Sequence, residues 1–561
     1  MNTEFILSAH ATLTKWETIN WSEINSYVKK LRQRIYSAEQ LGKTRKVRKL
    51  QRLMLISKAN LLLSIKQVTQ INKGKRTAGV DGYKVLKPSE RLTLFNKIVG
   101  KTVQLHKPSP ARRVYIQKKN GKLRPLGIPT IIDRTYQNVV KNALEPQWEY
   151  RFEPCSYGFR PGRGTHDAIE NIFTKARSNT KKKWVFEGDF RGCFDNLNHK
   201  HINEQLRGFS GKKIISKWLE AGYVDNKTFH MTNSGTMQGG PISPLLANIA
   251  LKGMEKEIGI ERNTYNGQIK QGVGLGLVIY ADDFVILTET REKANEMYEN
   301  LKPYLNKRGL ELSKEKTKIT HIEEGFNFLG FNIRQYKKMD GNKLLIKPNR
   351  ESVKKAKDKI KTTFEELKGH EVCRLISIMN PIIRGYANYW KPEVSKEIFG
   401  DMDNYIFTKV VKHLKRLHPK KSWKWKTQQY FRKPNQGGSK AKWILTCPKT
   451  NIQLLRMSWT KIERHIMVKH NNTPDNPALK EYWEKRKSKI FDNNNTMDKI
   501  KLANKQKYKC PFCKEHLQND RDETVEAHHK KSRSDGGTDE YKNIQLMACI
   551  LPYPIPSTEP S

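Results

Sequence analysis

The chain has 561 residues and a formal net charge of +50, because 106 Lys and Arg face only 56 Asp and Glu. This length suggests about three to four folding units, and no apolar run approaches the ~20 residues that a membrane span needs. The seven cysteines are too sparse for a disulfide framework and favour a reducing compartment. A chain this basic needs a polyanionic partner, and nucleic acid is the first candidate because bound Lys and Arg displace phosphate counterions.

The N-terminal region predicts basic helices. Residues 24–70 contain no Pro and a single Gly, and apolar residues such as Leu31 and Ile35 recur at helical spacing among Lys and Arg. This pattern indicates two or more amphipathic helices with a cationic outer face. A merely solvated face would give the same pattern, but with this net charge contact with nucleic acid is the favoured interpretation.

The character of the sequence then changes four times. Residues 76–335 alternate short apolar runs with turn residues and helical stretches, which is typical of an α+β arrangement around a sheet. Residues 350–450 are helical and basic again, whereas 470–500 are polar and predict a connecting segment. A small module containing Cys and His follows residue 505.

Two acidic motifs stand out in the second region. Two apolar runs are joined by Tyr280-Ala281-Asp282-Asp283, which predicts a β-hairpin whose tip presents adjacent carboxylates. Asp189 follows another predicted strand. Acids at the ends of buried strands repel one another unless a cation joins them. Together they predict an all-oxygen Mg²⁺ site, where two ions ~4 Å apart could activate a 3′-hydroxyl and stabilise leaving pyrophosphate. A turn or a helix cap is the ordinary explanation for any one Asp pair.

The order of the motifs resembles the group II intron-encoded reverse transcriptases and maturases. The resemblance covers roughly residues 20–545, and several blocks in order are far more specific than any one of them. The matching blocks are Thr77–Gly82, Arg124–Pro129 with Asp133-Arg134, Ser156–Arg163, Gln238–Pro244, Tyr280–Asp283 and Phe328–Phe331. Met237 stands where the family commonly has Pro.

The resemblance implies roles for individual residues. Asp189, Asp282 and Asp283 would be the catalytic acids, and the Phe190 carbonyl would complete the Mg²⁺ ligands. Phe194 would exclude a ribonucleotide 2′-hydroxyl and so favour dNTPs. The remaining nucleotide contacts would be made by Lys118, Arg124, Gln238 and Gly239. Lys118 and Arg124 flank Lys119-Asn120-Gly121, the turn of an expected hairpin, where Lys and Arg suit triphosphate oxygens.

A maturase-like segment follows. Leu375–Trp390 resembles the family's thumb, also called domain X, and the residues alone predict a helix break at Asn380-Pro381 followed by an aromatic helix. Core packing would explain such a helix by itself. With the resemblance, and with basic residues 420–433 after it, RNA contact is the favoured interpretation, because aromatic side chains stack on unpaired bases while cations follow phosphates. The expected RNA contacts are Arg384, Tyr386, Tyr389, Trp390, Trp423 and Trp425.

The C-terminal module resembles an HNH endonuclease with half of a zinc site. His528 would be a nuclease metal ligand, His529 the general base and Asn543 its orienting residue. Zinc would have only Cys510, Cys513 and Cys549 as ligands, with the last in doubtful register. The family's final catalytic His is absent, since a Pro-rich tail follows Cys549 instead. The sequence therefore predicts that second-strand DNA cleavage is weak or lost.

The expected fold is an α+β right-hand polymerase with a helical thumb, a basic DNA-binding segment and a small zinc- or HNH-like module. The expected divisions are a basic helical extension (1–75), fingers and palm (76–340), thumb (341–450), a DNA-binding or connecting region (451–504) and the incomplete endonuclease-like module (505–561).

The implied function is RNA-dependent DNA polymerisation combined with splicing assistance and intron mobility by target-primed reverse transcription. The implied partners are the group II intron RNA, target DNA and dNTPs, with no membrane. Two Mg²⁺ ions and a zinc ion are the implied cofactors. A non-enzymatic RNA-binding maturase and a retron-like reverse transcriptase are the alternatives. A bacterial cytoplasm is the expected location, an organelle is the alternative, and the oligomeric state stays open, with a dimer as one option.

Overall fold

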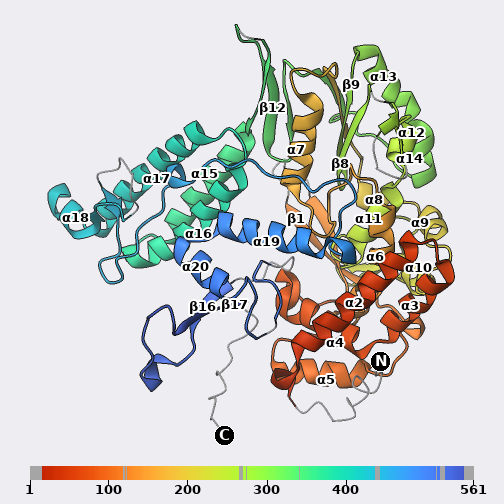
Figure 1. Cartoon of the computed structure of the whole chain (residues 1–561), viewed down its shortest axis with the longest axis horizontal. Coiled ribbons are helices and arrows are strands. Elements are labelled where there is room, and N and C mark those ends of the chain that lie inside the picture. The colour runs from red at the N-terminus through yellow and green to blue at the C-terminus, as the bar shows by residue number, and fades with distance from the viewer. Residues whose placement is uncertain are drawn as a thin grey trace.

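The computed structural model describes residues 15–117, 121, 123–263, 269–272, 274–339, 341–435, 443–512, 514–518 and 525–548. Figure 1 shows the N-terminal helices and palm on one side, the thumb on the other, and α19 (Lys480–Asn494) between them. Within these ranges no helix combines the length and hydropathy needed to cross a bilayer.

The N-terminal region is a helical bundle. Helices α2 (Trp21–Gln40), α3 (Thr44–Ile56) and α4 (Lys58–Lys66) pack with one another and with α6 (Ile131–Arg151). Val28, Leu31 and Ile35 form the buried stripe of α2, whereas Lys30 and Arg34 are exposed. The prediction of basic amphipathic helices is therefore confirmed.

The fingers carry a four-stranded sheet in the order β2-β1-β4-β5. Its strands are β1 (Ala111–Gln117), β2 (Leu123–Ile128), β4 (Tyr223–Asp225) and β5 (Thr228–His230). Strands β1 and β2 pair antiparallel as the expected hairpin, and β1 runs parallel to β4.

The palm sheet has the order β10-β3-β9-β8, and every pair in it is antiparallel. Its strands are β3 (Trp184–Asp189), β8 (Gly276–Tyr280), β9 (Asp283–Thr288) and β10 (Lys318–His321). Successive side chains point to opposite faces of a strand. Phe186 and Ile286 lie in the core shared with the N-terminal helices, whereas Val185 and Leu287 lie in the core shared with the thumb. Burial of both faces explains why the two runs around Tyr280–Asp283 are continuously apolar.

Helices surround the two sheets. They are α5 (Pro88–Ile98), α7 (Thr165–Ala176), α8 (Cys193–Asn196), α9 (His199–Gln205), α10 (Lys212–Glu220), α11 (Ser243–Leu251), α12 (Met254–Glu257), α13 (Arg291–Asn300) and α14 (Lys302–Arg308). A short pair of strands, β6 (Glu261–Arg262) and β7 (Ile269–Gln271), lies beside them.

A third sheet joins the palm to the thumb. It contains β11 (Phe326–Phe328), β12 (Phe331–Tyr336) and β13 (Lys343–Pro348), all antiparallel. The boundary expected between residues 340 and 341 falls between two strands of this sheet, so β13 belongs structurally with β12.

The thumb contains α15 (Arg350–Glu366), α16 (Val372–Trp390), α17 (Lys396–Leu417) and α18 (Trp423–Tyr430). The expected helix break at Asn380-Pro381 is wrong, because α16 runs through Pro381 without interruption. A proline inside a helix costs about 3 kcal/mol, but burial of Met379 and Ile383 offsets this at about 1.5–3 kcal/mol each. The Asn380 side chain also bonds the Gln453 carbonyl and the Leu455 amide, which fixes the helix at this point.

The segment expected to be a connector is also different from expectation. It contains α19 and α20 (Met497–Lys505), and Trp483 and Phe491 of α19 are buried. The polar composition of this segment gave no indication of a packed helix, because α19 buries only these two apolar side chains. The strand pairs β14 (Phe431–Arg432) with β15 (Ile444–Leu445) and β16 (Val525–His529) with β17 (Ile544–Ala548) complete the fold.

A disulfide links Cys373, near the start of α16, to Cys447, which follows β15. The few cysteines predicted no disulfide framework, and in the part of the chain that the structure describes this is the pair that is bonded. The bond connects the thumb helix to the segment that returns beside it.

Candidate active site

The β8–β9 hairpin presents the paired acids as expected. Tyr280 and Asp283 are register partners at its end, and Ala281 and Asp282 form the turn. Ala281 is buried and has a φ of 58°, a left-handed conformation that is uncommon for a residue with a Cβ. The surrounding packing therefore holds this turn in one shape.

Asp189 lies directly opposite Asp283 in the neighbouring strand pair β3–β9. Opposite residues of antiparallel strands have Cα atoms about 4.5–5.5 Å apart, so acids from distant parts of the sequence meet at one end of the palm sheet. Burial, then Asp282 and Asp189, raise the pKa of Asp283 to about 6. Burial is the largest cause of this raised pKa, and the two neighbouring carboxylates add to it.

Two cations counter this charge. The Lys316 Nζ lies 3.0 and 2.9 Å from the two carboxylate oxygens of Asp189. Lys316 and Arg124 both act to lower the pKa of Asp283. Arg124 thus lies close enough to the acids to influence them, as its expected role requires, whereas Lys316 was not among the residues singled out from the sequence. Nothing in its Lys-rich surroundings distinguishes it, so the sequence offered no signal for it.

Two glycines allow the acids to approach. A Cβ at Gly158 would lie 2.4 Å from the Ala281 amide nitrogen, so the segment around Gly158 packs flat against the turn. A Cβ at Gly188 would lie 2.0 Å from the ring of Phe284, which is its register partner across β3 and β9. Gly158 therefore lets its segment pack against the backbone of the turn, and Gly188 lets the Phe284 ring pack against β3, both beside the acids.

The other expected nucleotide contacts surround this end of the sheet. Phe190 is buried with its ring 5.0 Å from that of Phe284, and Phe194 is half-buried. The Gln238 carbonyl accepts a hydrogen bond from the Gly127 amide, and a Cβ at Gly239 would lie 2.5 Å from the Gly127 carbonyl oxygen. The loop at Gln238 and Gly239 thus packs against β2. Lys118 lies outside the described residues.

The donor set at this site fits a hard divalent cation. Carboxylate oxygens are the ligands that Mg²⁺ prefers, and Asp189 and Asp283 supply them from opposing strands. Among the residues that the structure describes, no group of three or more His, Cys, Asp or Glu has the arrangement of a metal site. The third acid, Asp282, lies in the β8–β9 turn, directly before Asp283. The Lys316 ammonium lies next to the Asp189 carboxylate.

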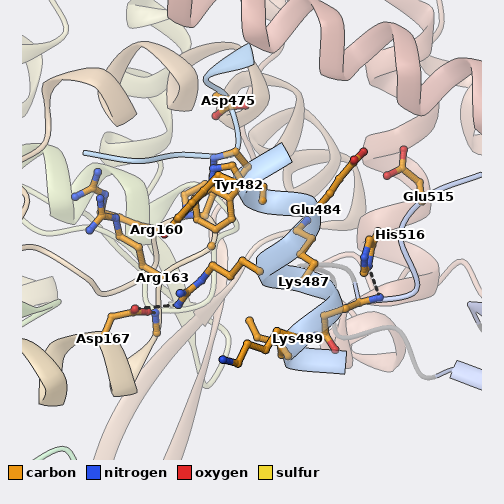
Figure 2. A pocket seen from close by; sticks show the side chains of 18 of the residues that line it. Arg160, Arg163, Asp167, Asp475, Tyr482, Glu484, Lys487, Lys489, Glu515 and His516 are labelled. Atoms are coloured by element: carbon orange, nitrogen blue, oxygen red, sulfur yellow. Dashed lines mark hydrogen bonds and ion pairs between the residues drawn. The ribbon is translucent and has the colours of Figure 1, made fainter. Parts of the chain in front are cut away.

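A large cleft lies apart from the paired acids, because none of Asp189, Asp282 and Asp283 lines it. Its volume is about 1390 Å³, and it is lined by the N-terminal helices, the segment 159–167, the thumb and α19. Figure 2 shows Asp167 pointing toward α19, to which a dashed line connects it. The Arg486 guanidinium of α19 lies 3.1 Å from Asp167, and the Lys391 ammonium of the thumb lies 3.1 Å from the Asn494 side chain. Helix α19 therefore connects palm and thumb.

The expected RNA contacts of the thumb divide into two sets. Arg384 is exposed, and Tyr386, Trp423 and Trp425 are half-buried, so their surfaces can reach a ligand. Trp390 is 1 % exposed and lies in the thumb core, which makes its expected contact with RNA wrong. Trp390 lies on the same face of α16 as Ile383 and Ala387, and this face packs into the thumb core.

Tyr389 is half-buried and lines the large cleft. Its hydroxyl donates to the Leu329 carbonyl at 2.8 Å, and its ring stacks on Phe331. It therefore connects the thumb helix to the β11–β12 turn.

The C-terminal module has the expected histidines on a strand pair. His528 and His529 end β16, and His528 Nε2 lies 3.8 Å from Glu526. His529 Nε2 lies 2.7 Å from Asp539, whereas the Asn543 side chain bonds backbone groups of Lys531 and Thr538. The expectation that Asn543 orients His529 is corrected, because Asp539 contacts the ring and Asn543 fixes the loop.

Of the expected zinc ligands, Cys510 is buried, and Cys513 and Cys549 lie outside the described residues.

Comparison with known protein families matches three segments of the chain. Residues 16–98 match the N-terminal domain of reverse transcriptase, and 116–333 match reverse transcriptase (RNA-dependent DNA polymerase). Residues 353–431 match the group II intron, maturase-specific domain. Protein YkfC of Escherichia coli is 34 % identical over 317 residues, which is 51 % of this chain and 83 % of YkfC. The chain belongs to the group II intron reverse transcriptase and maturase family.

The chain is also similar to a curated group II intron protein and to a solved telomerase structure. The group II intron-encoded protein LtrA of Lactococcus lactis is 36 % identical over 285 residues, 40 % of this chain and 47 % of LtrA. The match thus spans about half the length of LtrA. Among solved structures, telomerase from Candida albicans is similar at 13 % identity and a TM-score of 0.32, covering 56 % of this chain and 60 % of its own.

The matches to the family models and to LtrA confirm the main functional prediction. The protein is an RNA-directed DNA polymerase and splicing maturase with an RNA partner, and its polymerase domain works with a divalent metal ion.

Proposed function

We propose that Asp189, Asp282 and Asp283 are the catalytic acids with which this reverse transcriptase copies its own intron RNA into DNA. The observation that carries the proposal is the direct pairing of Asp189 with Asp283 across β3 and β9. The pKa of Asp283, raised to about 6, supports it, because carboxylates crowded in this way gain most from a divalent cation.

The acids and the Phe190 carbonyl would hold two Mg²⁺ ions. When bound, these ions supply activation of the primer 3′-hydroxyl and charge neutralisation on the triphosphate. The protein's own residues position the substrates. Arg124 binds the phosphates, Phe194 blocks a 2′-hydroxyl, and the Gln238-Gly239 backbone lets the nucleotide and template approach closely. The proposal thus assigns phosphate binding, sugar selection and the approach of the nucleotide to named side chains or backbone groups.

Primer extension by an Asp282→Asn variant tests the proposal. Loss of one metal-binding carboxylate is expected to lower cDNA synthesis on a primed RNA template at least a thousandfold, while splicing of the intron RNA stays near the wild-type rate. Asp401→Asn is the matched control, because Asp401 is exposed on α17 and far along the chain from the acids. Wild-type polymerisation by Asp282→Asn would refute the assignment, and equal loss of both activities would mean that the fold was damaged.

For splicing, we propose that exposed Arg384 and half-buried Tyr386, Trp423 and Trp425 contact the intron RNA. Their cationic and aromatic surfaces suit phosphates and unpaired bases. The same complex would support intron mobility by using a nicked DNA target as the primer.

For the C-terminal module, we propose that endonuclease activity is weak or lost. Residues 544–561 contain no His, although the resemblance places the remaining nuclease metal ligand there, and this supports the proposal. Cleavage of a duplex DNA target by the purified protein–RNA complex tests it, and efficient second-strand nicking would refute it.

A further inference from the structure

A two-stranded ribbon formed by β12 and β13 projects from the body of the protein (Figure 1). Its inner face is anchored, because Phe331, Ile333 and Ile346 are buried in the core shared with the thumb. The Gln335 side chain donates to the Ala176 carbonyl at 2.9 Å and fixes the ribbon to α7. The ribbon is therefore a rigid projection rather than a loose loop.

The outer face of the ribbon is cationic around one aromatic ring. The Arg334 guanidinium lies 5.2 Å and the Lys347 ammonium 5.7 Å from the centre of the Tyr336 ring. Lys338 and Lys343 are exposed near the tip, and neither forms an ion pair with any residue that the structure describes. Arg334, Lys343 and Lys347 therefore lie on the same face of the ribbon as Tyr336, and Lys338 follows the end of β12.

A groove of about 620 Å³ lies along the base of this face. Trp184, His321 and Tyr336 supply its aromatic surfaces, and Arg334 and Lys337 supply positive charge. The Trp184 and His321 rings are 5.0 Å apart, and the Arg291 guanidinium lies 5.5 Å from the Trp184 ring. The volume is within the range of about 300–1,000 Å³ that is typical of ligand sites.

The groove is separate from the polymerase site. Trp184 begins β3 and Asp189 ends it. At about 3.3 Å per residue, the two ends of this strand are roughly 16 Å apart. A ligand in the groove would therefore touch neither the acids nor the expected nucleotide contacts.

We propose that the groove and the outer face of the ribbon bind an unpaired segment of RNA. Aromatic surfaces interleaved with Arg and Lys are suited to stacked bases and the phosphates that join them. Glu323 and Glu324 also line the groove. Glu323 pairs with Lys337 at 3.5 Å, and a carboxylate in this position can accept a hydrogen bond from an N–H group of an unpaired base. Unpaired bases are displayed by the loops and bulges of folded RNA, whereas duplex DNA keeps its bases stacked.

Photo-crosslinking locates the site in the full-length wild-type protein. The probe is a 20-nucleotide oligouridylate RNA carrying 4-thiouridine, and the cross-linked peptides are identified by mass spectrometry. Peptides containing Trp184 or Tyr336 are expected. Cross-links confined to other surfaces would overturn the proposal. Asp282→Asn is expected to keep these cross-links, so failure of the polymerase assignment is distinguishable from failure of this one.

Two variants with matched controls measure the energetics. Tyr336→Ala is expected to weaken binding of the RNA probe about tenfold, because it removes the ring on which one base stacks. Lys338→Glu/Lys343→Glu is expected to reduce the slope of log K against log salt by about 1.4, at about 0.7 per phosphate contact. The controls are Tyr298→Ala on α13 and Lys213→Glu/Lys217→Glu on α10, which remove a similar ring or similar exposed charges elsewhere.

The controls and a DNA probe decide the outcome. Variants that bind the RNA no more weakly than their controls would overturn the proposal. An equal loss with an oligothymidylate DNA of the same length would also overturn it, because the site would then not favour RNA.

Discussion

Gly158→Ala tests whether packing behind the β8–β9 turn positions the catalytic acids. A Cβ at this position would lie 2.4 Å from the Ala281 amide nitrogen and 3.0 Å from the Tyr280 carbonyl carbon. An ordinary contact begins near 3.4 Å, so the turn has to retreat by about 1 Å. Backbone atoms rather than a flexible side chain form the obstacle, so the displacement passes directly to Asp282.

The expected size of the effect follows from this displacement. Overpacking of this kind costs about 1–3 kcal/mol of folding free energy, which lowers Tm by a few degrees. A misplacement of about 1 Å at reacting groups costs on the order of 10²-fold in rate. Polymerisation is therefore expected to fall far more than stability, and binding of the intron RNA is expected to stay unchanged.

Single-turnover primer extension on an RNA template measures the rate, with Tm measured in parallel. Gly164→Ala is the control, because Gly164 lies in the same segment, has an extended backbone with φ −149°, and a Cβ there meets nothing within 4 Å. A Gly158→Ala rate within twofold of the Gly164→Ala rate would refute the idea that this contact positions the acids.

Three further predictions concern other parts of the molecule. Burial, and then Glu170, raise the pKa of Glu393 to about 8, so the stability of the fold falls as pH rises from ~4 to ~8. Glu393→Gln should therefore raise Tm above the wild type at pH 8, with little difference at pH 5. An equal effect at both pH values would contradict this. Phe194→Ala should lower the preference for dNTPs over rNTPs about tenfold or more, measured as a ratio of kcat/KM; an unchanged ratio would remove Phe194 from sugar selection. Trp390→Ala should cost about 3–5 kcal/mol of stability, whereas Arg384→Ala should keep Tm and weaken RNA binding; the reverse pattern would restore Trp390 as an RNA contact.

The sequence predicted those parts of the structure that local patterns determine. The apolar runs on both sides of Tyr280–Asp283 required a hairpin, and Asp189 followed a strand, so their meeting at one end of a sheet could be expected. The N-terminal helices were equally visible from the spacing of Leu31 and Ile35.

Features that depend on tertiary packing escaped prediction. Helix α16 continues through Pro381 because Met379 and Ile383 are buried against other elements, which composition does not reveal. Trp390 looked like a ligand contact because burial cannot be read from one helical face. Lys316 was hidden among other lysines, and only the fold brings its ammonium to Asp189.

Iron-mediated cleavage of the backbone tests the central claim most directly. The full-length protein is loaded with Fe²⁺ in place of Mg²⁺ and treated with ascorbate and peroxide, so that radicals cut the chain next to the bound ion. Cuts are expected near residue 189 and near residues 282–283, and both should disappear in Asp282→Asn or Asp283→Asn. Cuts at one of these segments alone, or cuts that survive both substitutions, would contradict the convergence of these acids on a shared cation.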